Sequence, residues 1–487
     1  MKMIRRLFCL LFLCACQTVS AADAPWFPSL SSFEHHDSGR SRVFSKAKFK
    51  GNFSGNNEVD TLTSSNAYPS GYNMVYLNAK NVFIYGGGYG DVPGSIGAFV
   101  AKVDRHTLAP IWTNQLVDTS QNGEWDYPGS VAILGDGRLY VIYGYRLSKI
   151  DPVTGRTIAT LELPTGQGAQ ANTSYDGFNA TADGVLVMKS IYRQAGCSIQ
   201  GPDALLDCPD PTDVPASLLV SVDPHRMRVI DTITLPQPVA APPTIGMNHG
   251  STYVYLAEDT TVVRYRVKKG MFFLDNSWQP GTVTLGGQTT ATSYVVMGDW
   301  LVGQVNSLPS ATALSIIAIN QADASQQFSI QPFAGDPIPP LVAAAFSTAG
   351  PGGSPAISWA PASVSADPRR DLIYATDSLP GEIAAIELTK TGLQIVWKAN
   401  QTTTEFTALI GPPKKRVLVG TDIPGPQLPG NNLNDFAVWR NAQTGEEIAR
   451  SPLLPAMTQG TMIQPYYLGE IFYEGRSGQL VELRPHR

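Results

Sequence analysis

Charged residues are scarce in this sequence: 15% of its 487 residues are Asp, Glu, Lys or Arg, and the acids outnumber the bases. The first 21 residues hold three bases and no acid, so 32 bases face 40 acids in the remainder, a net charge of about −8. A protein that binds nucleic acid needs a basic surface to neutralise phosphates. The composition therefore excludes nucleic acid as a partner and argues against adsorption to anionic lipid.

Cysteine is rarer still, with five residues in all. Cys9, Cys14 and Cys16 lie in the N-terminal leader described below, which leaves only Cys197 and Cys208. One remaining pair in an exported chain is typical of a single disulfide. We predict that Cys197 and Cys208 form it, with two free thiols or a metal-binding pair as the alternatives.

Contiguous catalytic motifs are missing. The sequence contains no Gly-x-Ser-x-Gly, no His-Glu-x-x-His and no Cys-x-x-Cys. The glycine-rich run 86–91 lacks the Lys-Ser/Thr pair of a phosphate-binding loop. An enzyme with this sequence would have to assemble its site from separate segments.

Long apolar runs are also missing, and the N-terminus has only a short one. Lys2, Arg5 and Arg6 precede the apolar stretch 7–13, which is too short to span a bilayer, and small residues follow at 19–21. This pattern predicts a signal peptide over residues 1–21 and a periplasmic or secreted protein. The run 13–16 also resembles a bacterial lipobox, so a lipid anchor at Cys16 is the alternative.

The sequence does contain a repeat of short strands and tight turns. Its clearest copy runs over residues 130–161, with turns at 135–137 and 151–155. Eight such units follow one another, and a period of roughly 40–50 residues is typical of a β-propeller. We predict an all-β protein with a single propeller of eight four-stranded blades over residues 61–487. Seven blades is the alternative if the weak unit around 254–265 is not a blade.

The last repeat is incomplete, because only the strand 480–483 follows the one at 471. An unpaired strand edge favours aggregation. We therefore expect a strand from the N-terminal segment 22–60, either 42–44 or 49–53, to close the ring against the C-terminal strand.

This pattern resembles the quinoprotein alcohol dehydrogenase-like eight-bladed propellers. The resemblance rests on the turns 151–155 and 441–445 and on Trp112 and Trp397, and it extends over nearly the whole mature chain. It implies the propeller fold and, in the dehydrogenases, the cofactor PQQ. Those enzymes carry a vicinal cysteine pair beside the quinone, which this chain lacks, so PQQ is disfavoured.

The long insertions fall in two classes of connection. They lie between second and third strands or between repeats, and they occupy 86–96, 190–215, 306–312, 333–358 and 422–435. Both classes of connection emerge on the same face of a propeller, and loops on a rigid scaffold are where binding concentrates. We expect this face to bind the ligand.

Aromatic and acidic residues precede several repeats, where they would reach the mouth of the central channel. The expected ligand-binding residues are Tyr72, Trp125, Tyr127, Tyr175, Trp359 and Phe406, and the candidate catalytic acids are Asp126, Asp176 and Glu405. Aromatic walls with a few carboxylates suit sugars, aromatic compounds or cations. Packing between blades is the alternative role for each residue.

The segment 34–37, Glu-His-His-Asp, is the densest polar cluster. His35 and His36 are candidates for metal binding or acid–base catalysis. Adjacent residues of an extended chain point in opposite directions, so sharing one ion would require a turn. The alternative is a solvated segment or a strap across the propeller.

These features predict an exported propeller that binds a small molecule or a protein on its long-loop face. The alternative function is an oxidoreductase, hydrolase or lyase acting on an aromatic or sugar-like substrate at the channel mouth. The sequence does not identify a metal.

Overall fold

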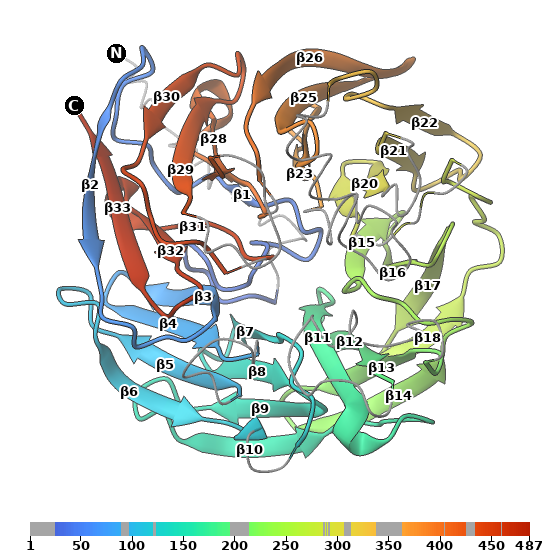
Figure 1. The fold of residues 1–487 in the computed structure, drawn as a ribbon. Helices are drawn as coiled ribbons and strands as arrows, with labels where there is room; N and C mark the ends of the chain where they lie inside the picture. Colours follow the sequence, from blue (N-terminus) through green and yellow to red (C-terminus); the bar gives the residue numbers. More distant parts are fainter. Residues whose placement is uncertain are drawn as a thin grey trace, which may run out of the picture.

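The computed structural model of the protein describes residues 25–88, 97–119, 123–194, 214–285, 288, 290, 293–305, 313–337, 363–403, 405–424, 434–458 and 460–487. Their regular secondary structure is nearly all β-strand, and the strands form eight sheets arranged as blades around a central axis (Figure 1). The protein is an eight-bladed β-propeller, as the repeat predicted.

The blades follow one another along the chain, each running outward from the axis. Blades 1 and 2 contain β3 (Gly71–Asn78), β4 (Asn81–Gly86), β5 (Phe99–Val103), β6 (Pro110–Gln115), β7 (Ser130–Ile133), β8 (Leu139–Tyr143), β9 (Arg146–Ile150) and β10 (Thr157–Glu162). Blades 3 and 4 contain β11 (Thr173–Ala180), β12 (Leu186–Tyr192), β13 (Leu218–Asp223), β14 (Arg228–Thr234), β15 (Thr244–Asn248), β16 (Ser251–Ala257), β17 (Val262–Lys268) and β18 (Met271–Leu274). The unit around 254–265 is thus a complete blade, and the seven-bladed alternative is wrong.

The other four blades complete the ring. Blades 5 and 6 contain β19 (Val295–Met297), β20 (Trp300–Val305), β21 (Ser315–Asn320), β22 (Gln327–Ile330), β23 (Ser365–Asp367), β24 (Leu372–Asp377), β25 (Glu382–Thr389) and β26 (Gly392–Asn400). Blades 7 and 8 contain β27 (Ala408–Ile410), β28 (Val417–Asp422), β29 (Phe436–Asn441), β30 (Glu447–Arg450), β31 (Gln464–Pro465), β32 (Ile471–Glu474) and β33 (Leu480–His486). Three short 3₁₀ helices occur in the described ranges, at Gln170–Asn172, Pro413–Lys415 and Tyr467–Gly469.

Burial along a blade explains its sequence pattern. The second strand β8 is buried at every position and is entirely apolar or aromatic, because neighbouring blades cover both of its faces. The outer strand β10 alternates between exposed and partly buried residues. The tight turns have a local cause: the Asp151 carboxylate accepts hydrogen bonds from the backbone N–H groups of Val153 (2.8 Å) and Thr154 (3.1 Å).

The two faces of the ring differ in their connections. Turns between first and second strands, and between third and fourth strands, lie on one face, which we call the short-turn face. The remaining connections lie on the opposite face, the long-loop face. Most of the long insertions expected to bind a ligand fall outside the described residues.

An N-terminal strand closes the ring, but it is not one of the two segments expected. β2 (Glu58–Thr63) pairs antiparallel with β33 and forms the outer strand of blade 8. β1 (Val43–Phe44) instead pairs in parallel with β27 and becomes a fifth, innermost strand of blade 7. Phe49 and Phe53 pack against the largest apolar core cluster and form no strand.

Residues 25–44, which we call the strap, cross the centre of the ring before the chain turns outward. In Figure 1 this blue segment enters the middle of the ring beside β1. Inner strands of six blades donate backbone hydrogen bonds to strap carbonyls, at donor–acceptor distances of 2.7–3.3 Å; the donors are Tyr76, Ile133, Ile245, Val296, Ala366 and Leu409. Ser38 Oγ donates to the carbonyl of Ala180 in blade 3, and Gln464 of blade 8 donates to Ser31 Oγ. The strap therefore contacts all eight blades.

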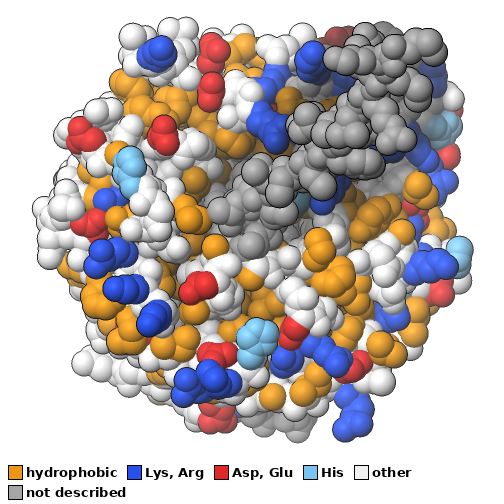
Figure 2. Space-filling model, turned by 180° about the vertical axis from the view of Figure 1, so that it is seen from behind, with side chains coloured by type: hydrophobic (Ala, Val, Ile, Leu, Met, Phe, Trp, Pro, Cys, Tyr) orange, Lys and Arg blue, Asp and Glu red, His pale blue; other side chains and the backbone are white. Residues whose placement is uncertain are grey.

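Viewed from behind, basic and acidic side chains are interspersed over the visible described residues, with apolar side chains between them (Figure 2). No helix in the described part of the chain is both long enough and apolar enough to cross a membrane.

Candidate functional site

A tight turn in the strap forms the candidate site. His36 N–H donates to the Phe33 carbonyl (3.0 Å) and Arg40 N–H to the Asp37 carbonyl (2.9 Å). His36, Arg40 and Arg42 have φ angles of 75°, 62° and 60°, the left-handed region that non-glycine residues rarely adopt. Strained backbone of this kind persists only where the surrounding structure fixes it, and it clusters at functional sites.

Arg42 is fully buried and held by fixed partners. Its Nη1 donates to the carbonyls of Ser363 and Val364, its Nη2 to Ser363 Oγ, and its Nε to His35 Nδ1 at 3.0 Å. The guanidinium carbon lies 4.3 Å from the centre of the Phe406 ring. Ser363, Val364 and Phe406 precede inner strands, so Arg42 lies on the long-loop side of the strap.

His35 is a neutral imidazole in this site. Burial, together with the charges of Arg40 and Arg42, lowers its pKa well below the usual range. Its Nδ1 accepts the hydrogen bond from Arg42, so the proton belongs on Nε2, which lies 3.5 Å from Glu34 Oε1. His36 is partly exposed and faces elsewhere, with its ring centre 4.8 Å from that of Phe44.

Glu34 and Arg40 form the less constrained part of the site. Burial raises the pKa of Glu34 to about 7 against the opposing effects of Arg40, Arg42 and a hydrogen bond from Tyr72. Burial also lowers the pKa of Arg40, although Glu34, Tyr72, Asp176 and Asp37 act in the opposite direction. Arg40 is 2% exposed, and its Nε has no hydrogen-bond partner among the described residues.

A buried ion pair lies beside this turn. Lys189 Nζ donates to Asp176 Oδ2 at 3.0 Å and to the Ala240 carbonyl at 2.6 Å. Burial raises the pKa of Asp176, and Lys189 and Arg40 oppose that shift. Asp176 Oδ1 has no hydrogen-bond partner within the described ranges. Glu34, His35, Arg40, Asp176 and Lys189 thus form one polar cluster, which we call the axial cluster.

The residues expected at the channel mouth separate into two groups. Tyr72 donates to Glu34, Phe406 contacts Arg42 and His35, and Tyr127 lies close enough to Asp176 for that carboxylate to raise its pKa. These three residues and Asp176 border the axial cluster.

The second group contacts residues outside the axial cluster. Trp125 packs against Tyr127 and Ile191. The Tyr175 hydroxyl donates to the Pro164 carbonyl (2.6 Å). Glu405 Oε2 accepts from Gly460 and Thr461 N–H, and Asp126 Oδ1 accepts from Gly144 N–H. Burial raises the pKa of Asp126 to about 7. Trp359, Cys197 and Cys208 lie outside the described residues.

Sequence reasoning did not select Arg40, Arg42 or Lys189. The sequence offered two signals for them: a pair of arginines in the short polar run 38–42, and a single lysine inside the apolar strand β12. A lysine in a buried strand needs a paired acid. In the part of the chain that the structure describes, no group of three or more His, Cys, Asp or Glu side chains could hold a metal ion.

No family model matches this sequence, and no curated protein is significantly similar to it. Among solved structures, a quinohemoprotein alcohol dehydrogenase from Pseudomonas putida HK5 matches 93% of this chain and 80% of its own, with a TM-score of 0.57 and 11% identity. The corresponding enzyme from Comamonas testosteroni matches 95% and 81%, with a TM-score of 0.56 and 11% identity. The chain therefore has the fold of the quinoprotein alcohol dehydrogenase-like propellers, and at this identity the likeness concerns the fold alone.

Two features of the sequence and of the described residues bear on the quinone, which the sequence disfavoured. Cys197 and Cys208 are not adjacent in sequence, so they cannot form the vicinal pair of the PQQ alcohol dehydrogenases. The strap also fills the axis with Phe33, His35 and Arg42, each of them fully buried. Neither observation favours PQQ in this channel.

Proposed function

We propose that this chain is an exported binding protein that holds a small carboxylate-bearing molecule in the axial cluster, on the long-loop side of the strap. The observation that carries the proposal is Arg40, a nearly fully buried guanidinium whose Nε has no hydrogen-bond partner among the described residues. Burying a charge is costly unless it is paired and hydrogen-bonded. A bound anion would supply that pairing.

The charges around Arg40 support an anionic ligand. Asp176 is already engaged by Lys189, and Glu34, with a pKa of about 7, is only partly ionised at neutral pH. Asp37 also attracts Arg40, yet the pKa of Arg40 stays lowered, so the three acids offset its burial incompletely. Tyr72 and Tyr127 border the cluster and would contact the apolar body of a ligand.

A panel of small carboxylates, beginning with benzoate, tests the proposal against the matched neutral amides. Isothermal titration of the mature protein should give binding of a carboxylate but not of its amide. Arg40→Gln should weaken that binding at least tenfold, because hydrogen bonds to charged groups contribute about 1.5–3 kcal/mol. Arg228→Gln, at an exposed arginine of β14, is the control. Equal affinity in wild type and Arg40→Gln would refute the proposal.

Acid–base catalysis at the same cluster is a second candidate, favoured by one observation. Glu34, with a pKa of about 7, lies beside a neutral histidine, and a general acid or base works best when its pKa is near the operating pH. Mass spectrometry of a carboxylate ligand after incubation distinguishes the two functions. Turnover that Glu34→Gln abolishes while binding persists would establish an enzyme; an unchanged ligand would leave a binding protein.

Export is the other part of the proposal, and it rests on the N-terminal sequence. The mass of the protein recovered from the periplasm should correspond to cleavage near residue 21. An acylated N-terminus at Cys16 would instead establish the lipoprotein alternative, and Cys16→Ser would abolish membrane retention.

Cys197 and Cys208 should resist alkylation until they are reduced. A protein partner on the long-loop face is the remaining alternative, and a pull-down with a variant lacking residues 195–213 tests it.

A further inference from the structure

A cavity of about 350 Å³ lies on the short-turn side of the strap. The strap passes blades 3 to 6 with only four residues, 38–41, and makes hydrogen bonds to Ala180, Ile245, Val296 and Ala366 along the way. This short crossing leaves the space between the strap and the turns of those blades unfilled. Its lining residues are Asp37, Ser38, Gly39, Ser41, Ala180, Ala182, Ile245, Gly246, Met247, Thr252, Val296, Gly298 and Pro368.

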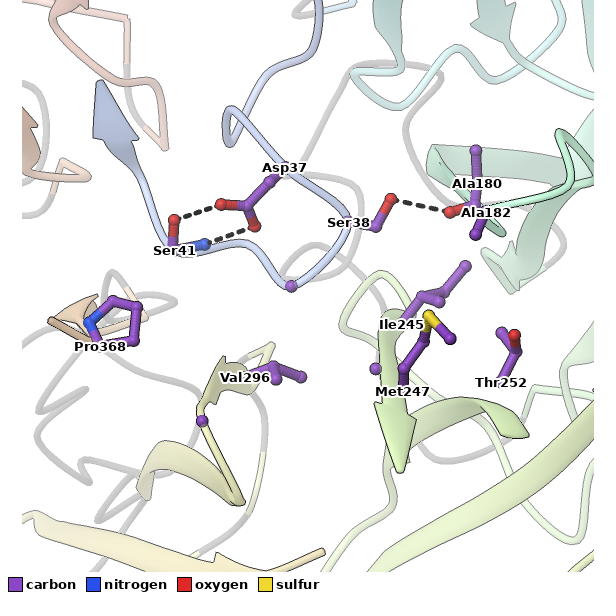
Figure 3. Close-up of a pocket in the computed structure, with 13 residues that line it drawn as sticks. Asp37, Ser38, Ser41, Ala180, Ala182, Ile245, Met247, Thr252, Val296 and Pro368 are labelled. Carbon is purple, nitrogen blue, oxygen red and sulfur yellow. Dashed lines mark hydrogen bonds between the residues drawn. The ribbon is translucent and has the colours of Figure 1, made fainter. Parts of the chain in front are cut away.

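The lining is mostly apolar; its polar side chains are Asp37, Ser38 and Ser41 of the strap and Thr252 beside Met247. Figure 3 shows Val296 and Pro368 on one side of the space and Ile245 and Met247 on the other, with the strap crossing above them. Asp37 is the single ionisable side chain in the lining, and its carboxylate accepts hydrogen bonds from the backbone N–H (3.1 Å) and the hydroxyl of Ser41. These bonds hold the carboxylate in place. A carboxylate oxygen can accept more than one hydrogen bond, so a donor on a ligand can join those from Ser41.

We propose that this cavity is a second binding site, for a small apolar molecule that carries one hydroxyl or amine donor. The volume is within the range of small-molecule sites, which are largely apolar with a few polar groups that fix orientation. The apolar walls would hold the body of the ligand, and Asp37 would accept its donor. An ionised carboxylate has no donor to offer Asp37, so this site and the axial cluster select different chemistry from the two ends of one channel.

Benzyl alcohol, toluene and benzoate are matched probes of this site. Isothermal titration of the mature protein should give binding of benzyl alcohol that is stronger than that of toluene. Ala182→Phe places a ring into the cavity from an exposed turn position and should weaken benzyl alcohol binding at least tenfold. Ala322→Phe, at an exposed turn position outside the cavity lining, is the matched control and should bind as wild type does.

Two further measurements keep this proposal separate from the axial one. Asp37→Asn should remove the preference for benzyl alcohol over toluene, with the melting temperature reporting whether the variant folds. Benzoate binding at the axial cluster should be the same in Ala182→Phe and wild type. Failure of wild type to bind benzyl alcohol, or undiminished binding by Ala182→Phe, would overturn the second site whatever the result for benzoate.

Discussion

Arg40 and Arg42 lie two positions apart on the strap, both are buried, and both have left-handed backbone, with φ angles of 62° and 60°. Burial lowers the pKa of each. Their hydrogen bonds differ. Arg42 donates to His35, to Ser363 and to the Val364 carbonyl, whereas Arg40 Nε has no partner within the described residues.

The difference separates a structural charge from one available to a ligand. Arg42 connects the strap to the loop before β23 and to His35, so its donors are consumed by the fold. Arg40 lies near three acids. Glu34 is only partly ionised, Asp176 is engaged by Lys189, and Asp37 accepts hydrogen bonds from Ser41. A buried polar group without a partner requires an explanation, and a bound ligand is one.

The largest effect should come from Arg42→Met. This change leaves His35 Nδ1 and the carbonyls of Ser363 and Val364 without their donor, at about 1–3 kcal/mol for each buried unsatisfied group. Relief of the buried charge offsets part of this loss, so we expect the free energy of unfolding to fall by about 3 kcal/mol. Urea denaturation measures it, with the exposed Arg228→Met as the control, expected within about 0.5 kcal/mol of wild type. A loss as small as that of the control would mean that Arg42 is not structural.

The pH dependence of stability should reveal Glu34 next. An unfolded Glu34 loses its proton near pH 4.5, whereas the folded protein keeps it until about pH 7. The folded state binds more protons between these values, so the free energy of unfolding should fall as pH rises from 4.5 to 7, by about 2–3 kcal/mol from this group.

Glu34→Gln should remove that part of the slope, whereas Glu446→Gln, at an exposed turn, should keep it. Asp126 contributes a slope of the same sign in every variant, so it cancels in the comparison. Urea denaturation at pH 5, 6, 7 and 8 gives the four values needed. Identical slopes in wild type and Glu34→Gln would show that Glu34 is ionised normally.

Arg40→Met should have a smaller effect on the unliganded protein. The lowered pKa of Arg40 indicates that burial outweighs the attraction of Glu34, Tyr72 and Asp176, so removing the charge should change stability by less than about 1 kcal/mol. The melting temperature with and without a bound carboxylate checks this, because only wild type should gain stability from the ligand. A loss comparable to that in Arg42→Met would place both arginines in the structural class.

The propeller could be predicted from sequence because its determinants are local. The turn at 151–155 is fixed by Asp151 bonding to the N–H groups two and three residues later, and β8 shows its burial in five consecutive apolar or aromatic residues. The prediction of the closing strand was wrong because the segments 42–44 and 49–53, upstream of Glu58–Thr63, matched a strand pattern as well as the correct one. Their actual positions depend on contacts with blades 7 and 8, hundreds of residues later.

The axial cluster could be predicted only in part. His35 was conspicuous as a scarce residue type and Asp176 as a charged one. The conformation of the strap, however, depends on hydrogen bonds from inner strands between residues 76 and 409. No sequence periodicity indicates such long-range hydrogen bonds. Trp125, Tyr175 and Glu405 matched the expected type of ligand-binding residue equally well. The hydroxyl of Tyr175 and the carboxylate of Glu405 are bonded to backbone groups, and Trp125 packs against Tyr127 and Ile191. Residue type alone does not separate such partners from a ligand.

A last variant, at Phe406, tests whether the two arginines are independent. The Arg42 guanidinium carbon lies 4.3 Å from the centre of this ring, so Phe406→Leu should lose a cation–π interaction of about 1 kcal/mol while keeping most of the apolar volume. A double-mutant cycle should give a coupling of about that size between Phe406→Leu and Arg42→Met, and one near zero with Arg40→Met. The urea-derived free energies of the single and double variants provide both values. Equal coupling to both arginines would mean that Phe406 contacts one shared cationic site, and the division between a structural and a ligand-binding arginine would then be incorrect.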